Sequence, residues 1–175
     1  MPPATSGSAA IKQIDIDRTA DAVRELGRQA LAVPTDVTER ADLERLVEAA
    51  VAEFGRIDIA CNNAGVLVFE KAVENISLKE WDWSIGVNIY GVIHGIRAFL
   101  PRIRKHGQGG HIVNTASIGG FQVAAALRTA AYATTKFAVV ALTEGLRNDL
   151  LGTNIGVSVL APAAVDTGIY RSPLQ

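Results

Sequence analysis

Tyr132 and Lys136 are the two residues of this chain whose chemistry and spacing best fit a shared task. They are four positions apart in a segment with helical periodicity, so their side chains project from one face of a helix. A tyrosine with a pKa of about 10 is a poor base at neutral pH. A nearby ammonium group favours the phenolate and lowers that pKa, which lets the pair act as general acid and base. The bland alternative is an ordinary pair on a solvated helix face.

Three other polar segments could contribute to a site: two follow predicted strands, and one lies within a predicted helix. Asn62-Asn63-Ala64-Gly65 follows one strand, Asn88 lies in a long helix, and Ser117 ends the strand before the tyrosine helix. Taken singly, they have ordinary explanations as a turn, a locally bonded helix residue and a cap. In this order and together with Tyr132 and Lys136, they predict an active site.

The elements that would position these residues alternate between short apolar strands and helices. Strands are expected at 11–16, 57–61, 111–116 and 155–160, with another apolar run at 30–33, and helices at 18–26, 38–55, 78–104 and 130–151. This alternation predicts an α/β fold with a parallel, doubly wound sheet and helices on both faces. Ligands bind such sheets outside the carboxyl ends of the strands, which is where the polar segments fall.

Local signals mark several element ends. Gly27 stands where the first helix would stop, Thr38 could cap the second, and Ser77 with Glu80 forms a capping-box pattern before the third. Residues 1–10 read as a disordered lead-in, and residues 11–175 as a single domain.

Composition excludes several classes of protein. The 175 residues carry a formal net charge of -1, which argues against a nucleic-acid or anionic-membrane partner. Cys61 is the only cysteine, so no intramolecular disulfide is possible, and a reducing, cytoplasmic location is expected. The first residues lack the basic and apolar regions of a secretory signal, and no apolar stretch reaches membrane-spanning length.

The motifs together resemble the short-chain dehydrogenase/reductase family, over about residues 11–167. The matching segments are Asp36-Val37, Asn62-Asn63-Ala64-Gly65, Val87-Asn88-Ile89-Tyr90-Gly91, Ile112-Val113-Asn114-Thr115-Ala116-Ser117, Tyr132-Ala133-Thr134-Thr135-Lys136, and Pro162 followed by Val165 and Thr167. The resemblance implies a Rossmann-like fold and an NAD(P)-dependent oxidoreductase that interconverts a secondary alcohol and a ketone.

The resemblance also assigns catalytic roles. Tyr132 would exchange the proton with the substrate oxygen, which Ser117 would hold. Lys136 would lower the tyrosine pKa and hydrogen-bond the nicotinamide ribose. Asn88 would anchor a water molecule that leads protons away from Lys136.

Further residues would bind the cofactor. By resemblance, Asp36 meets the adenine amino group with Val37 beside the ring, and Asp15, expected at the end of the first strand, takes the adenosine ribose hydroxyls. A carboxylate there repels a 2′-phosphate, so NAD is favoured over NADP. The remaining predicted cofactor residues are Asn62, Ala64 and Gly65, Tyr132 and Lys136, and Pro162, Val165 and Thr167.

The chain departs from the family pattern at both ends. No Thr-Gly-x-x-x-Gly-x-Gly turn is present, although that loop normally supplies backbone N–H groups for the pyrophosphate. In the family's strand order 3-2-1-4-5-6-7, the first strand is central, so its absence is expected to leave two sheet pieces. The last strand and a substrate-covering segment are also missing. A fragment or truncated form with weak NAD binding and little turnover is therefore expected.

The loop after Ser117 gives a prediction about the substrate. Ile118, Phe121 and the run 124–127 would border the pocket, which indicates a small apolar alcohol or ketone. The helices 78–104 and 130–151 resemble those of the family's dimer interface, so a homodimer is expected.

One alternative is a binding or regulatory protein that kept the fold without catalysis. Another is a flavodoxin-like domain, which would leave Tyr132, Lys136 and Ser117 unexplained.

Overall fold

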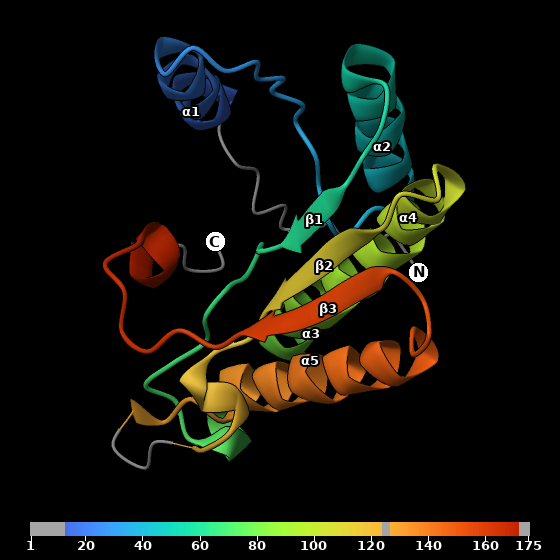
Figure 1. The fold of residues 1–175 in the computed structure, drawn as a ribbon. Helices are drawn as coiled ribbons and strands as arrows, with labels where there is room; N and C mark the ends of the chain where they lie inside the picture. Colours follow the sequence, from blue (N-terminus) through green and yellow to red (C-terminus); the bar gives the residue numbers. More distant parts are fainter. Residues whose placement is uncertain (1–12, 124–126, 172–175) are drawn as a thin grey trace, which may run out of the picture.

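The computed structural model describes residues 13–123 and 127–171 (Figure 1). The helices are α1 (Gln13–Glu25), α2 (Arg40–Phe54), α3 (Leu78–Ile85), α4 (Gly91–Lys105) and α5 (Ala130–Asp149), and the strands are β1 (Ile59–Asn62), β2 (Gly110–Thr115) and β3 (Ile155–Leu160). A π-helical turn, η2 (Gly86–Tyr90), joins α3 to α4, and short 3₁₀ turns occupy Val73–Asn75, Ile118–Gly120 and Gly168–Arg171.

The three strands form one parallel sheet in the order β1-β2-β3. Asn62 pairs with Asn114, and Thr115 pairs with Leu160, so the three strands end close to one edge. The segments that leave this edge include the loop after β1, Ser117, and the loop after β3. The predicted parallel α/β arrangement is confirmed, and the β3 bounds agree with the expected 155–160.

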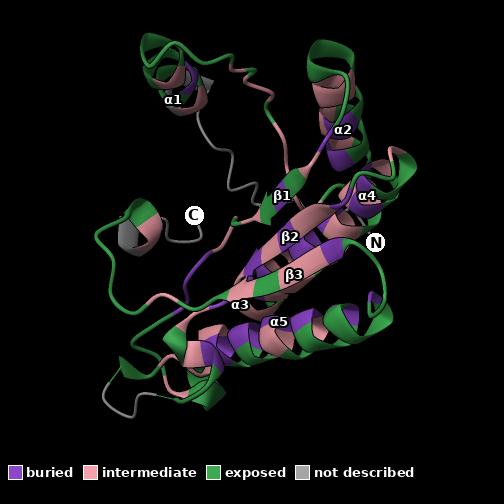
Figure 2. Ribbon diagram, viewed as in Figure 1, coloured by how far each residue is buried: buried purple, intermediate pink, exposed green. Residues whose placement is uncertain are grey.

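The main core lies between one face of the sheet and helices α2, α4 and α5. Its buried residues come from all three helices and all three strands or the residue leading into them: Val47, Ile57, Ala60, Leu100, Ile103, Ile112, Leu146, Leu150 and Ile155. Figure 2 shows the buried positions gathered on the sheet and on the inner sides of these helices. Fully removing an aliphatic side chain from water stabilises the fold by about 1.5–3 kcal/mol, which makes this layer the main source of stability.

The opposite sheet face is open in the part of the chain that the structure describes. Ile59 is 63% exposed and Leu160 is 51% exposed, and Cys61 is exposed beside them. Helix α1 stands apart from the sheet (Figure 1). Helices on both faces are therefore not seen among the described residues.

The predicted strand at 11–16 is wrong for its described part. Gln13 begins helix α1, so Asp15 lies inside a helix instead of at a strand end, and the run 30–33 is not a strand. A strand needs a neighbour for its backbone N–H and C=O groups, whereas a helix satisfies them internally. No strand among the described residues pairs with the outer edge of β1, so the expected second sheet piece is absent there. Residues 11 and 12 and the lead-in at 1–10 lie outside the described residues.

The helix-end signals had mixed outcomes. Gly27 and Gly55 adopt φ of 71° and 81° after α1 and α2, where glycine is favoured. The Ser77–Glu80 capping box is present at the start of α3. Thr38 does not cap α2, because the helix begins at Arg40 and the Thr38 hydroxyl donates to Asp36 Oδ1 instead.

The predicted helix 78–104 is helical throughout, but its hydrogen bonding changes from α-helical to π-helical at η2. This π-helical turn contains the fully buried Asn88, and such turns often occur at functional sites.

Helix α5 ends at Asp149, two residues before the predicted end. The homodimer expected from these two helices stays a prediction. Of the helices that the structure describes, none combines the length and apolarity that crossing a membrane requires.

The two helical glycines Gly95 and Gly145 should respond oppositely to alanine. A Cβ at Gly95 would lie 1.9 Å from Asn62 Oδ1, whereas one at Gly145 would meet nothing within 4 Å. We expect Gly95→Ala to lower the free energy of unfolding by roughly 1–3 kcal/mol through overpacking. Gly145→Ala should raise it by about 0.5–1 kcal/mol through helix propensity. Urea unfolding measures both, and equal effects would contradict the close packing of α4 on β1.

Candidate active site

Lys136 is the most deeply buried charged side chain near the carboxyl ends of the strands. It is 3% exposed, and its Nζ donates to the backbone carbonyl of Thr115 at the end of β2, at 2.8 Å. Burial lowers the pKa of Lys136 from an ordinary 10.5 to about 8, because the ammonium loses its hydration. The predicted alternative of a pair on a solvated helix face does not fit Lys136.

Tyr132 lies one turn before Lys136 on the same side of α5. The Lys136 Nζ is 5.5 Å from the centre of the Tyr132 ring. Gly119 links the ring to Ser117: a Cβ on this glycine would be 3.6 Å from Ser117 Oγ and 3.6 Å from Tyr132 Cε1. The ring of Tyr132 therefore lies near the Lys136 amine, and it flanks Gly119 together with Ser117 Oγ.

Ser117 is held where β2 gives way to a 3₁₀ turn. Its Oγ accepts a hydrogen bond from the Gly119 N–H at 3.1 Å and reaches the Pro162 carbonyl at 3.5 Å. The Ile118 N–H donates to the same carbonyl at 2.9 Å. These bonds connect the loops after β2 and β3, so Pro162 helps to fix the position of the serine.

Asn88 is fully buried, and its amide group is occupied by three hydrogen bonds. Its Oδ1 accepts from the Val66 N–H at 2.8 Å, and its Nδ2 donates to the Val66 carbonyl and to Thr135 Oγ1, both at 2.9 Å. Asn88 thus ties the loop after β1 to helix α5. Both N–H donors of the amide are thereby used, and the water contact of Asn88 stays a prediction.

Gly65 makes the closest approach of the β1 loop to the lysine. A Cβ at this position would lie 3.3 Å from Lys136 Nζ and 3.5 Å from Asn88 Oδ1. Any larger residue would press on both groups. Gly65, one of the small residues predicted to pass near a cofactor, therefore lies beside the amine.

Asn62 belongs to a second buried polar chain, one layer deeper. Its Nδ2 donates to Asn114 Oδ1 at 2.8 Å, Asn114 Nδ2 donates to Thr143 Oγ1 at 3.1 Å, and the Thr143 hydroxyl donates to the Val139 carbonyl at 2.7 Å. This chain runs from β1 through β2 to α5. It fixes the start of the Asn62–Gly65 loop relative to the helix that carries Tyr132 and Lys136.

Val37 packs against the start of α4, and Asp36 bonds within the turn that precedes α2. A Cβ at Gly91 would be 2.9 Å from Val37 Cγ2, and His94 Nδ1 lies 3.1 Å from the Val37 carbonyl oxygen. Asp36 Oδ1 accepts from both the backbone N–H and the hydroxyl of Thr38. These contacts hold the segment against α4, although no strand precedes it among the described residues.

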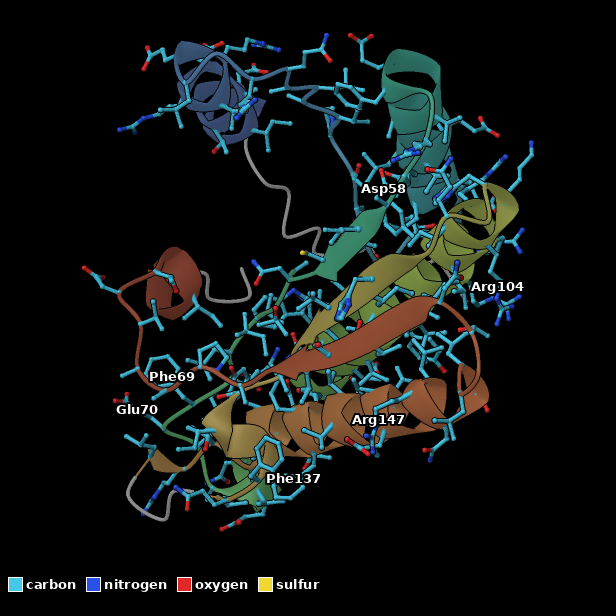
Figure 3. All side chains as sticks on the ribbon, viewed as in Figure 1. Asp58, Phe69, Glu70, Arg104, Phe137 and Arg147 are labelled. Atoms are coloured by element: carbon cyan, nitrogen blue, oxygen red, sulfur yellow. The ribbon has the colours of Figure 1, made fainter. Side chains whose placement is uncertain are left out.

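Three predicted cofactor residues are not brought to this cluster. Val165 and Thr167 lie on the exposed loop after β3, where the Thr167 hydroxyl accepts from the Ile169 N–H at 3.4 Å. Asp15 lies in α1, and α1 stands apart from the sheet in Figure 1. Figure 3 shows Phe69 and Glu70 on the loop at the carboxyl edge of the sheet, with Asp58 and Arg104 at the opposite end.

Sequence reasoning gave no role to Thr115 or Thr135, which supply the partners of Lys136 and Asn88. The Thr115 contact uses a backbone carbonyl, so no residue type could have indicated it. The spacing of Thr135, three residues after Tyr132, was a usable signal, because a threonine hydroxyl can bond a carbonyl one turn back.

Comparison with known proteins identifies the family. The family model for short chain dehydrogenases matches residues 5–173. An uncharacterized oxidoreductase from Staphylococcus saprophyticus is 41% identical over 155 residues, which are 87% of this chain and 61% of that protein. The 1-deoxy-11-beta-hydroxypentalenate dehydrogenase of Streptomyces avermitilis is 40% identical over 159 residues, or 89% of this chain and 58% of that enzyme.

Solved structures agree with this result. A short-chain dehydrogenase/reductase from Burkholderia phymatum, determined in complex with NAD, superposes with a TM-score of 0.88 at 38% identity, over 93% of this chain and 57% of that one. The chain therefore belongs to the short-chain dehydrogenase/reductase family of oxidoreductases, and the predicted Rossmann-like fold is confirmed. It spans about 60% of the length of these relatives.

The buried lysine should make stability depend on pH. Between pH 8 and 10.5 the folded chain loses the Lys136 proton while the unfolded chain keeps it, so the free energy of unfolding rises with pH. We expect the free energy of unfolding of wild type, minus that of Lys136→Met, to rise by roughly 3 kcal/mol across this window, at about 1.4 kcal/mol per pKa unit. Urea unfolding at several pH values measures it. A difference that stays constant would show that Lys136 titrates alike in both states.

Proposed function

We propose that this chain carries the catalytic centre of a nicotinamide-dependent oxidoreductase that interconverts a secondary alcohol and a ketone. The observation that carries the proposal is the buried Lys136 ammonium, which lies one helical turn from Tyr132 and donates to the Thr115 carbonyl, two residues before Ser117. If Tyr132 and Lys136 were an ordinary pair on a solvated helix face, Lys136 would not be buried against the end of β2. A phenol, an ammonium and a hydroxyl meeting there form a proton-exchanging site.

Each residue has a definite part in the proposed reaction. During reduction the Tyr132 hydroxyl gives its proton to the substrate oxygen, and during oxidation the phenolate takes it back. Lys136 favours the phenolate by its charge, and Ser117 holds the substrate oxygen by a hydrogen bond. After reduction, the Tyr132 phenolate would regain a proton from the Lys136 ammonium, and Lys136 would recover it from solvent near Asn88. When bound, the cofactor supplies or accepts the hydride.

The residues present suit the nicotinamide end of such a cofactor. Lys136 has three N–H donors, and only the one to Thr115 is used within the described residues. The absence of a side chain at Gly65 keeps the space beside this amine open. Lys136 and Tyr132 would hold the nicotinamide ribose, Asp36 and Val37 the adenine. Asn62, Ala64, Gly65 and Pro162 would line the path between. Val165 and Thr167, which the resemblance assigns to the cofactor's carboxamide, lie on the exposed loop after β3, away from this cluster.

NAD is the cofactor that we propose, because the similar Burkholderia protein was determined with NAD. Asp15 no longer supports this preference, since it lies within α1. We also propose that affinity is low, because the sequence has no glycine-rich pyrophosphate loop.

The proposed substrate is apolar. Ile118, next to Ser117, is 47% exposed, and Phe121, Val123 and Leu127 are more than half exposed on the following loop. A hydrogen bond from the Glu70 N–H to the Leu127 carbonyl, at 3.3 Å, joins this loop to the loop after β1. In this proposal these hydrophobic side chains would border the substrate, and they suit an alcohol or ketone with an apolar body.

Replacement of Tyr132 tests the proposal. With millimolar NADH, chosen to overcome weak binding, wild type should reduce apolar ketones slowly and prefer NADH to NADPH. Tyr132→Phe should lower this rate about 100-fold or more, because it removes the general acid. Absorbance at 340 nm follows the reaction.

Tyr90→Phe is the matched control, since Tyr90 is 53% exposed and loses the same hydroxyl. Its rate should equal that of wild type. An NADH-linked rate that survives in Tyr132→Phe, or no turnover by wild type across the ketone panel, would contradict the proposed function.

A further inference from the structure

Thr135 occupies a position between the two catalytic groups that the proposed reaction does not use. It is 0% exposed and follows Tyr132 by three residues on α5, immediately before Lys136. Its Oγ1 donates to the Tyr132 carbonyl at 2.8 Å and accepts from Asn88 Nδ2 at 2.9 Å. The single hydroxyl therefore satisfies one donor and one acceptor from different elements.

The partner of this hydroxyl is fixed from the other side. Both remaining hydrogen bonds of the Asn88 amide go to Val66, through its N–H and its carbonyl. Val66 directly follows Gly65, whose missing side chain leaves room for Lys136 Nζ. A continuous path thus leads from the loop after β1, through η2, to the backbone of the catalytic tyrosine.

We infer that Thr135 is a positioning residue, which sets Tyr132 and Lys136 relative to the Asn62–Gly65 loop through Asn88. This inference rests on the proposed function, and it names a residue that touches neither the substrate nor the hydride path. The hydroxyl is needed because a buried Nδ2 donor without an acceptor is costly. A valine has the same shape and no hydroxyl, so it would release Asn88 and the Tyr132 carbonyl together.

The position of a general acid affects the rate more than it affects binding. A misplacement of about 1 Å can lower the rate about 100-fold even when the reacting groups remain. Loss of Thr135 should therefore lower kcat while the KM for the cofactor changes little. Serine keeps the hydroxyl and should restore the rate, although it lacks the methyl group.

Three variants test the inference. We expect Thr135→Val to lower kcat about 10- to 100-fold with the KM for NADH within about threefold of wild type. Thr135→Ser should keep kcat within about threefold. Thr134→Val is the matched control, because Thr134 is the adjacent residue, is exposed, and undergoes the same chemical change. Its kcat should be unchanged. Thermal unfolding of each variant checks that it is folded.

Nuclear magnetic resonance supplies a readout that does not need turnover. In wild type and Thr135→Ser, both side-chain amide protons of Asn88 should exchange slowly with solvent. In Thr135→Val one should exchange faster, and the ring signals of Tyr132 should shift. If wild type has no turnover but these changes occur, the proposed function fails and the positioning role stands. Unchanged Asn88 and Tyr132 signals in Thr135→Val, or equal kcat for Thr135→Val and Thr134→Val, would overturn the inference.

Discussion

Burial of the Lys136 ammonium against the end of β2 is the constraint to which the rest of the site conforms. Removing an ammonium group from water is costly unless hydrogen bonds replace part of its hydration. The Thr115 carbonyl provides one such bond, and burial still lowers the lysine pKa to about 8. The parallel sheet makes the contact possible, because it brings the ends of β1 and β2 to the edge where α5 begins. Helix α5, which begins at Ala130 after the loop that follows Ser117, then carries Tyr132 and Lys136 to this edge.

The surrounding residues are explained by the need to keep this amine in place and accessible. Gly65 leaves space beside it, and Asn88 fixes the loop that contains Gly65. The π-helical turn η2 delivers the Asn88 amide into the protein interior. The deeper chain from Asn62 through Asn114 to Thr143 repeats the connection between sheet and helix one layer below. Buried polar groups in both chains are satisfied by one another, which favours a single arrangement of loop and helix.

The sequence predicted the part of the fold whose signals are local. The Ser77–Glu80 cap, the glycine at position 55 and the apolar run of β3 each depend on neighbouring residues, and each was found as predicted. Whether residues 11–16 form a strand depends instead on a partner strand, and none pairs with them among the described residues. Asp15 was misplaced for that reason.

For the site, residue types and spacing were enough to bring Tyr132, Lys136, Ser117 and Asn88 together. They could not reveal the hydrogen bond from Lys136 to the Thr115 carbonyl or the one from Asn88 to Thr135, because these contacts arise where α5 packs against β2 and η2. Val165 and Thr167 were assigned by resemblance, and their loop is exposed here. Motifs therefore predicted which residues react, and tertiary packing determines what holds those residues in place.

The ionisation of Lys136 tests this account most directly. A titration of the Lys136 side chain by nuclear magnetic resonance, in protein labelled at lysine, would give its midpoint without any substrate or cofactor. The account predicts a midpoint near 8, well below the ordinary 10.5. A midpoint at the ordinary value would mean that the amine is hydrated, and that it does not lie buried beside Tyr132.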